Sequence, residues 1–308
     1  MLRYMLVRIV GAVPVLLGIT IAVFFMVRLV PGDPIDIMYS NQPKPSPELR
    51  AQIERDMGLD LPIHRQYVRF VGNALQGDLG TSYRTKQPVT EHITARMPNT
   101  AKLTIASLAI ALAIGLTAGV LSATFRNSWI DRISMLIAVA GVSVPAFWLG
   151  LMLILLFSVK LGWFPVAGSQ GWRYLVLPAF TLGLVVSAVL ARITRAGMIE
   201  ALEQDYVRTA RAKGLHEFFV VYRHALRNAL IPIITIIGLL IGSLLSGAFI
   251  IEAVFGYPGL GLLAVQALTT RDFPMIQGIV LFVAVVYVVV NLVVDILYGF
   301  IDPRIKYT

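Results

Sequence analysis

The chain has no cysteine and few charged side chains. None of its 308 residues is a cysteine, which excludes disulfides and thiolate metal sites and leaves the redox compartment undetermined. Charged residues make up 14% of the sequence, whereas a soluble domain usually has about 25%. Hydrophobic residues make up 57%, and the mean hydropathy is +0.78. The sequence therefore has too few polar side chains for a water-facing surface and indicates a membrane protein.

Signatures of catalysis are also missing. No glycine is followed by Lys-Ser or Lys-Thr, so the sequence contains no phosphate-binding P-loop. We find no convergent acid/base set and no plausible metal cluster, which argues against a membrane enzyme. The net charge of +9 does not indicate nucleic-acid binding, because lysine and arginine ordinarily flank membrane spans. We expect no catalytic residue, no metal site and no cofactor in this chain.

Long apolar segments predict the architecture. A bilayer core about 30 Å thick needs roughly 20 apolar helical residues, and only helices suit spans of this kind. We expect an all-α integral membrane protein in which residues 1–308 form a single transmembrane domain. The six predicted spans are residues 9–30, 103–124, 133–159, 174–191, 229–251 and 275–299. The first follows Arg3 and Arg8 like a signal peptide, but it lacks a small-residue cleavage pattern and is expected to be retained.

The distribution of positive charge predicts the topology. Six spans place both termini on one side of the membrane. Arginine and lysine are concentrated near the two ends of the chain and in the segments 125–132 and 192–228, whereas the short segments 162–173 and 252–274 contain few. Because short cytoplasmic loops carry the excess of positive charge, both termini and the loop 196–228 are predicted to be cytoplasmic.

The region 31–102 after the first span is predicted to be a folded extracytoplasmic loop. Ser46 is a candidate helix N-cap, and Gly58 lies near the end of the same helix, over residues 45–60. A second helix is indicated at residues 66–76 and a turn at 77–82. This loop is either a docking surface or a cap that only stabilises the bundle.

Residues 247–274 are apolar but broken by glycine and proline, which predicts a helix–turn–helix dipping into the outer mouth between spans five and six. Glu252 in this region either lines a solute path or is an interfacial carboxylate paired with an arginine. Asp295 is the acid that falls inside a predicted span. A functional role competes there with snorkelling or an ion pair. The spans offer no chain of acids and histidines for a proton relay.

The loop between spans four and five is polar, basic and predicted to be helical. Apolar residues recur at helical spacing from Ile199 to Ala210, and Gly214 can take the left-handed conformation that ends a helix. A second helix is predicted from about Glu217 through Tyr222 into span five. Such a helix–turn–helix is suited to receive a push from a soluble partner. The alternative is an amphipathic helix lying on anionic membrane lipid.

Seven motifs, in order along nearly the whole chain, resemble those of one family. They are LVPGDP (29–34), GDLGTS (77–82), PVTEHI (88–93), SVPAFWLGLMLILLFSVKLGWFP (143–165), YVRTARAKGL with RHALRNALIP (206–232), the elements at Glu252, Phe255, Pro258–Gly259 and Arg271–Asp272, and DPRIKY (302–307). The chain resembles ABC importer permeases of the dipeptide, oligopeptide and nickel branch, and is most similar to the B-type, first permease subunit. One departure is that Arg208-Thr209-Ala210 stands where the broad importer consensus begins Glu-Ala-Ala.

The resemblance implies a type I importer fold and the roles of three residue sets. A short cytoplasmic coupling helix seats on a separate ATPase through Tyr206, Arg208, Thr209, Ala210, Lys213, Gly214 and Leu215. The candidates for an outer gate or pore are Glu252, Phe255, Pro258, Gly259 and Asp295. The candidates for outer docking are Asp33, Asp78, Arg271 and Asp272.

The implied function is uptake of dipeptides or oligopeptides across the bacterial cytoplasmic membrane, with nickel or glutathione as alternative substrates. The implied partners are a homologous C-type permease, two ABC ATPases that bind ATP and Mg²⁺, and an extracytoplasmic substrate-binding protein. The competing hypothesis from another class is a gradient-driven transporter or channel that works without ATPases. It predicts uptake that is sensitive to Glu252 or Asp295 and indifferent to residues 208–215.

Overall fold

The computed structural model describes residues 2–29, 33–39, 43 and 45–301. Within these residues every regular element is helical, and the one β-bridge, between Thr81 and Pro88, is isolated. The elements are α1 (Leu2–Arg28), α2 (Pro34–Met38), α3 (Pro47–Met57), α4 (Ile63–Leu75), α5 (Val89–Thr124), α6 (Trp129–Ser143), α7 (Ala146–Leu153), the π-helix η1 (Ile154–Lys160), α8 (Arg173–Leu202), α9 (Asp205–Ala212), α10 (Glu217–Phe219), the π-helix η2 (Val220–Ala225), α11 (Leu226–Val254), α12 (Leu260–Thr269) and α13 (Phe273–Ile301).

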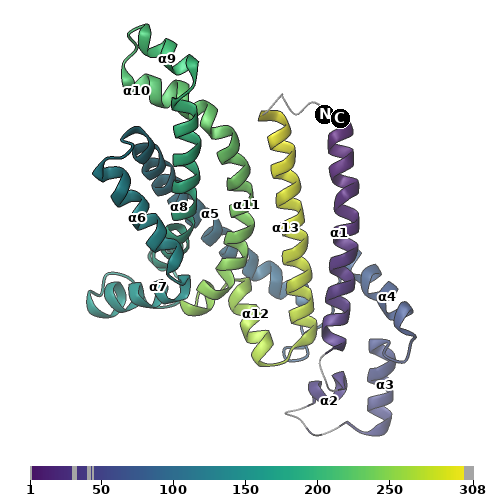
Figure 1. Cartoon of the computed structure of the whole chain (residues 1–308). Coiled ribbons are helices and arrows are strands. Elements are labelled where there is room, and N and C mark those ends of the chain that lie inside the picture. The colour runs from purple at the N-terminus through teal and green to yellow at the C-terminus, as the bar shows by residue number, and fades with distance from the viewer. Residues whose placement is uncertain (1, 30–32, 40–42, 44, 302–308) are drawn as a thin grey trace.

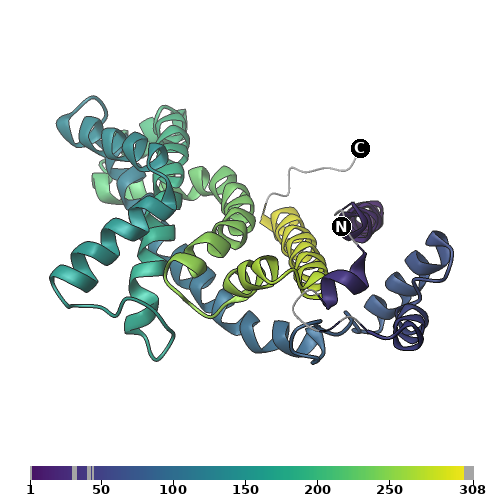
Figure 2. The same cartoon turned by 90° about the horizontal axis from the view of Figure 1, so that it is seen from below.

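Five helices of the described residues are long and apolar enough to cross a membrane, namely α1, α5, α8, α11 and α13. A sixth crossing is present if α6 and the following helical segment count together as one span. Figure 1 shows α1 and α13 side by side at one edge of the molecule, α6, α7 and α8 at the other edge and α11 between them, while α5 runs obliquely behind α11. Figure 2 gives the same order from below, with α12 beside α13.

The predicted third span, residues 133–159, is a pair of helices with a sharp bend and not one continuous helix. The chain bends by 102° between α6 and the helical segment that begins at Ala146. Val144 is extended there, with φ −86° and ψ 125°. The cause is Pro145, because proline disfavours helical conformation in the residue before it. Hydropathy does not reveal this bend, because the residues on both sides of it are strongly apolar.

Two other spans are longer than predicted. Helix α5 begins at Val89 rather than at residue 103, and α8 continues to Leu202 rather than ending at residue 191. Hydropathy finds where an apolar run ends, but a helix continues wherever its backbone remains hydrogen-bonded and its polar side chains have partners. Pro178 lies near the start of α8 and does not end the helix.

The close contact between α5 and α8 depends on glycine. At Gly119 an added Cβ would lie 2.5 Å from the Cβ of Thr194 and 2.7 Å from the backbone oxygen of Ala191. Gly183 on α8 and Gly115 on α5 are also too close to the opposite helix for a Cβ, whose nearest neighbours would lie at 2.7 Å and 2.9 Å. Small residues let membrane helices approach until their backbones nearly touch, which increases dispersion contact. These glycines therefore fix α5 and α8 as one packed pair.

Helices α2, α3 and α4 lie near one end of α1 (Figure 1), and α4 packs against it. Ser46 caps α3 by accepting a hydrogen bond from the Leu49 amide (3.3 Å), and Gly58 ends it with φ +68°. Both predictions for this helix are confirmed. Helix α4 confirms the second predicted helix, and the Tyr67 hydroxyl lies 2.8 Å from the Thr20 hydroxyl of α1.

The helix–turn–helix predicted over 247–274 is present as the end of α11, a turn and α12. Glu252 organises this turn, and its side chain is fully buried. The Thr100 hydroxyl donates to its Oε1 (2.6 Å), and the amides of Gly261 (2.6 Å) and Leu262 (3.4 Å) donate to its Oε2. The described partners of Glu252 are therefore a hydroxyl and the free amides at the start of α12, a favourable place for a carboxylate.

Some sequence expectations lie outside the described residues. The motif LVPGDP does so in part and DPRIKY entirely, and the side chain of Asp295 is also outside the described set.

The packing of α5 on α8 predicts the effect of a single methyl group. Gly119→Ala is expected to lower the free energy of unfolding by about 1–3 kcal/mol, the usual cost of overpacking. Gly11→Ala on α1 is the matched control, because an added Cβ there meets nothing within 4 Å. Thermal unfolding followed by tryptophan fluorescence in detergent checks the difference. Equal melting temperatures for the two variants would contradict the account.

Glu252→Gln is expected to destabilise the α11–α12 turn, because the new NH₂ group must face either the Gly261 amide or the Thr100 hydroxyl, both of which donate to the carboxylate. The expected cost is about 1–3 kcal/mol, the cost of leaving a buried donor unsatisfied. Glu200→Gln, at an exposed position of α8, is the control. Limited proteolysis at the turn, together with thermal unfolding, measures the effect. A turn as resistant in Glu252→Gln as in the control variant would refute this role.

Candidate functional site

The strongest candidate site is the segment between α8 and α11. Helix α8 ends at Leu202, and Gln204 is extended, with φ −73° and ψ 152°. The chain therefore turns and starts a separate helix, α9, at Asp205. The helical spacing found from Ile199 to Ala210 in fact spans two helices with a break between them. Figure 1 shows α9 and α10 at one end of the molecule, beyond the end of α8.

Gly214 ends α9, as predicted. Its φ is +76°, and an added Cβ would meet nothing within 4 Å. Glycine is therefore favoured by backbone conformation and not by space. The amide of Gly214 donates to the Arg211 carbonyl (2.9 Å) and that of Leu215 to the Ala210 carbonyl (3.3 Å), which satisfies carbonyls at the end of the helix.

One face of α9 is buried against the rest of the chain, and the other face is exposed. Val207 is fully buried and Ala210 is 6% exposed, and both belong to a core cluster that includes Val220 and Val221 of η2. Of the seven residues predicted for this site, Ala210 thus faces inward. The remaining six are exposed and share α9 and the turn that follows it: Tyr206, Arg208, Thr209, Lys213, Gly214 and Leu215. The sequence analysis did not identify Val207 as a buried residue of α9, although residues three apart lie on the same helical face and Val207 precedes Ala210 by three.

An ion pair closes the loop around Gly214. Arg211 donates from Nη2 to Oε1 of Glu217 (2.6 Å) and from Nε to Oε2 (3.1 Å). The Arg211 guanidinium lowers the pKa of the Glu217 carboxyl and so keeps it charged. The His216 ring accepts a hydrogen bond from the Phe218 amide and caps α10. From α10 the chain runs through η2 into α11, which confirms the predicted second helix.

Four of the outer gate or pore candidates, Glu252, Phe255, Pro258 and Gly259, are buried or half-buried within this chain. Phe255 is 2% exposed and lies against Gly150 of α7, where an added Cβ would be 3.0 Å from its ring. The Pro258 carbonyl accepts a hydrogen bond from the Asn99 side chain (2.9 Å), and Gly259 is pressed against Glu252. A role for these residues in a solute path stays a prediction.

The outer docking candidates are not brought into one cluster by the contacts of the described residues. Asp33 binds Arg50 of α3 (2.5 Å), and Asp78 caps the amide of Gly80 (2.9 Å). Arg271 is exposed and has φ +53°.

The fourth docking candidate, Asp272, is 4% exposed and accepts hydrogen bonds from the Ser82 hydroxyl and the Tyr83 amide. Burial raises the pKa of the Tyr83 hydroxyl well above its usual value. Asp272 ties the α12–α13 turn to the segment that contains Ser82 and Tyr83, and its carboxylate is too deeply buried to be a docking contact.

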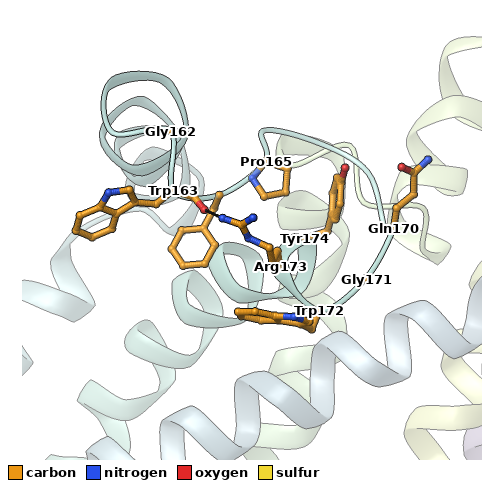
Figure 3. A pocket seen from close by; sticks show the side chains of 9 residues that line it. Gly162, Trp163, Pro165, Gln170, Gly171, Trp172, Arg173 and Tyr174 are labelled. Atoms are coloured by element: carbon orange, nitrogen blue, oxygen red, sulfur yellow. Dashed lines mark hydrogen bonds between the residues drawn. The ribbon is translucent and has the colours of Figure 1, made fainter.

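A cavity of about 360 Å³ lies at the end of α8 opposite to α9, between the segments 162–165 and 170–174. In Figure 3 the Arg173 side chain points toward the Trp163 backbone, to whose carbonyl it donates a hydrogen bond (2.5 Å). Trp163 and Trp172 are exposed. Exposed tryptophan beside arginine is typical of a membrane–water interface. No residue of this cavity was predicted as a site.

Comparison with known proteins gives a consistent result. Residues 115–307 match the family model described as binding-protein-dependent transport system inner membrane component, and residues 1–104 match the model of its N-terminal region. The glutathione transport system permease protein GsiC is 44% identical in Escherichia coli (strain K12) and 46% identical in Pectobacterium atrosepticum. Each alignment covers 100% of this chain and 100% of the relative.

Solved structures share the fold. One is an inward-facing conformation of the MetNI methionine ABC transporter, with a TM-score of 0.59 and 20% identity over 68% of this chain and 96% of that chain. Another is an amino acid ABC transporter with histidines, with a TM-score of 0.52 and 22% identity over 70% of this chain and 95% of that chain. These similarities confirm the predicted type I importer fold. The chain belongs to the family of binding-protein-dependent transport system inner membrane components, and is a multi-pass permease subunit of an ABC importer.

Proposed function

We propose that this permease subunit forms half of the path by which an ATP-driven importer moves short peptides into the cytoplasm. In this proposal α9 and the Gly214 turn are the seat of a separate ATPase subunit. The proposal rests on the two faces of α9. One face is basic and exposed, and the opposite face packs against η2 through Val207 and Ala210. A helix held in this way presents a rigid surface to a soluble partner.

The connections of α9 suit it to transmit movement. It follows α8 after a two-residue break and leads through α10 and η2 into α11, so two long helices are joined covalently to it. The pair of Arg211 and Glu217 stiffens the loop between α9 and α10. A displacement imposed on α9 therefore reaches both α8 and α11. By resemblance to the family, ATP binding closes the ATPases and opens the path outward, and hydrolysis resets it.

The proposed assembly contains a C-type permease, two ATPases and an extracytoplasmic binding protein besides this chain. The ATPases bind ATP and Mg²⁺, and this chain contributes neither a cofactor site nor a catalytic group. We place both termini and α9 on the cytoplasmic side. The start of α1 and the end of α13 lie at the same end of the molecule as α9 (Figure 1), which supports this orientation together with the distribution of positive charge.

The proposed substrate class is short peptides. Sequence resemblance favours dipeptides or oligopeptides, whereas the relatives at 44–46% identity are named for glutathione. Glutathione is itself a modified tripeptide, so a single path for small zwitterionic peptides accommodates both. In systems of this kind the binding protein sets specificity, and the path needs only weak contacts with its substrate. Nickel is the remaining alternative.

Gly214→Ala is expected to reduce the peptide taken up per ATP hydrolysed by about tenfold, a coupling loss in the usual range. The methyl group is compatible with the space but disfavours the left-handed backbone by about 1–2 kcal/mol. Gly162→Ala is the control, since Gly162 also has a positive φ (+65°) and open surroundings but lies outside the proposed seat. Proteoliposomes containing all subunits allow uptake and hydrolysis to be measured together. Normal uptake per ATP in Gly214→Ala would refute the coupling assignment.

Uptake of a labelled dipeptide by the same proteoliposomes is expected to require ATP and to persist when an ionophore collapses the proton gradient. Unlabelled oligopeptide and glutathione are expected to compete, and Ni²⁺ is not. Competition by Ni²⁺ alone would contradict the substrate class. Uptake that needs the proton gradient and proceeds without ATPases would instead establish the gradient-driven alternative.

A further inference from the structure

A buried carboxylate joins three segments next to the proposed ATPase seat. Asp131, in the first turn of α6, is 4% exposed. The Ser122 hydroxyl of α5 and the Arg195 Nε of α8 (2.6 Å) donate to its Oδ1. The amide of Asn127 in the α5–α6 turn (2.9 Å) and the Arg195 Nη2 (2.7 Å) donate to its Oδ2. One side chain thus binds α5, the α5–α6 turn and α8 to the start of α6.

The geometry of this cluster makes it stiff. The Arg195 guanidinium binds both carboxylate oxygens, and the two-point contact fixes its orientation as well as its distance. A buried charge is costly unless it is paired and hydrogen-bonded, and Asp131 meets both conditions. Any displacement of α8 relative to α6 that separates the two groups therefore exposes or isolates a charge. Relative sliding of α6 and α8 is opposed at this point.

The position of the cluster connects it to α9. Arg195 lies about two helical turns before the end of α8, and α9 begins shortly after that end. A second, exposed ion pair links Arg126 of the α5–α6 turn to Glu203 just after α8 (2.6 Å). Within the described residues α6 packs mainly against α5 and α8, and α9 mainly against η2.

We propose that the Asp131–Arg195 pair is the link through which movement of α9 is passed from α8 to α5 and α6. Asp131 is a positioning residue in this scheme: it does not touch the ATPase or the substrate, but it makes the cytoplasmic ends of α5, α6 and α8 move as one body. The inference rests on the proposed function, because α9 must receive the movement that the pair passes on.

The test uses the complete reconstituted importer with Asp131→Asn in this chain. The variant keeps the size of the side chain and removes its charge. We expect peptide uptake per ATP hydrolysed to fall by about tenfold, while ATP hydrolysis continues. Glu203→Gln is the control, because it removes the carboxylate of the neighbouring exposed pair, and exposed pairs contribute little. Its uptake per ATP is expected to remain within about twofold of the parent.

A distance measurement separates transmission from a general loss of structure. Because the chain has no cysteine, spin labels can be placed on cysteines introduced at exposed Ile137 of α6 and Leu268 of α12. In the parent complex, a nonhydrolysable ATP analogue is expected to shift the distance between the labels. In Asp131→Asn this shift is expected to be lost. Docking is measured separately with a cross-linker attached to a cysteine introduced at position 209 in place of Thr209, and this cross-link to the ATPase is expected to form in Asp131→Asn as in the parent.

Each outcome is informative. A normal shift and normal uptake per ATP in Asp131→Asn would overturn the inference, and so would loss of the Thr209 cross-link in that variant alone, because the pair would then serve docking. Failure of the Thr209 cross-link in the parent complex would instead contradict the proposed seat of the ATPase. If Asp131→Asn does not fold, Arg195→Lys and Ser122→Ala provide milder tests. Parental uptake per ATP and a parental shift in both would overturn the inference.

Discussion

The close packing of α5 against α8 is the constraint on which the rest of the structure depends. Gly119 and Gly183 let the two backbones approach to a distance that no larger residue permits. Helix α8 leads after a two-residue break to α9, and α5 leads through the α5–α6 turn to α6. The packed pair therefore carries both the proposed ATPase seat and the helices that this seat has to move. A looser α5–α8 contact would leave α9 attached to the chain but mechanically isolated from the remaining spans.

Acidic side chains have different structural roles at the two ends of the bundle. At the end that holds α12 and the outer loop, Glu252 and Asp272 are buried and bind backbone amides and hydroxyls from distant segments. These acids hold the turns around α12 in place. At the α9 end, Asp131 joins three helices, and the basic side chains of α9 remain exposed. Arg208 and Arg211 are exposed there but pair with Asp205 and Glu217, so the surface at that end carries both signs of charge with basic side chains in excess.

Much of this fold was predictable from local signals. Apolar length found the spans, Ser46 and Gly58 marked the ends of α3, and Gly214 marked the end of α9. The bend after α6 was missed because a single proline interrupts helix geometry without lowering hydropathy. The distant partners of Asp131, Glu252 and Asp272 were also missed, since Arg195, Thr100 and Tyr83 lie 64 to 189 residues away and only packing brings them together. The exposed residues of α9 were identified through resemblance, but the burial of Ala210 required the structure.

The central claim is that this chain works as one permease in a multisubunit importer whose ATPases are separate polypeptides. The most direct test is gentle detergent purification of the chain, expressed together with its genomic neighbours, followed by native mass spectrometry of the intact particle. The account predicts a particle that contains this chain, one homologous permease and two P-loop ATPase domains. A particle that contains this chain alone, or only copies of it, would contradict the account and favour a transporter that works without ATPases.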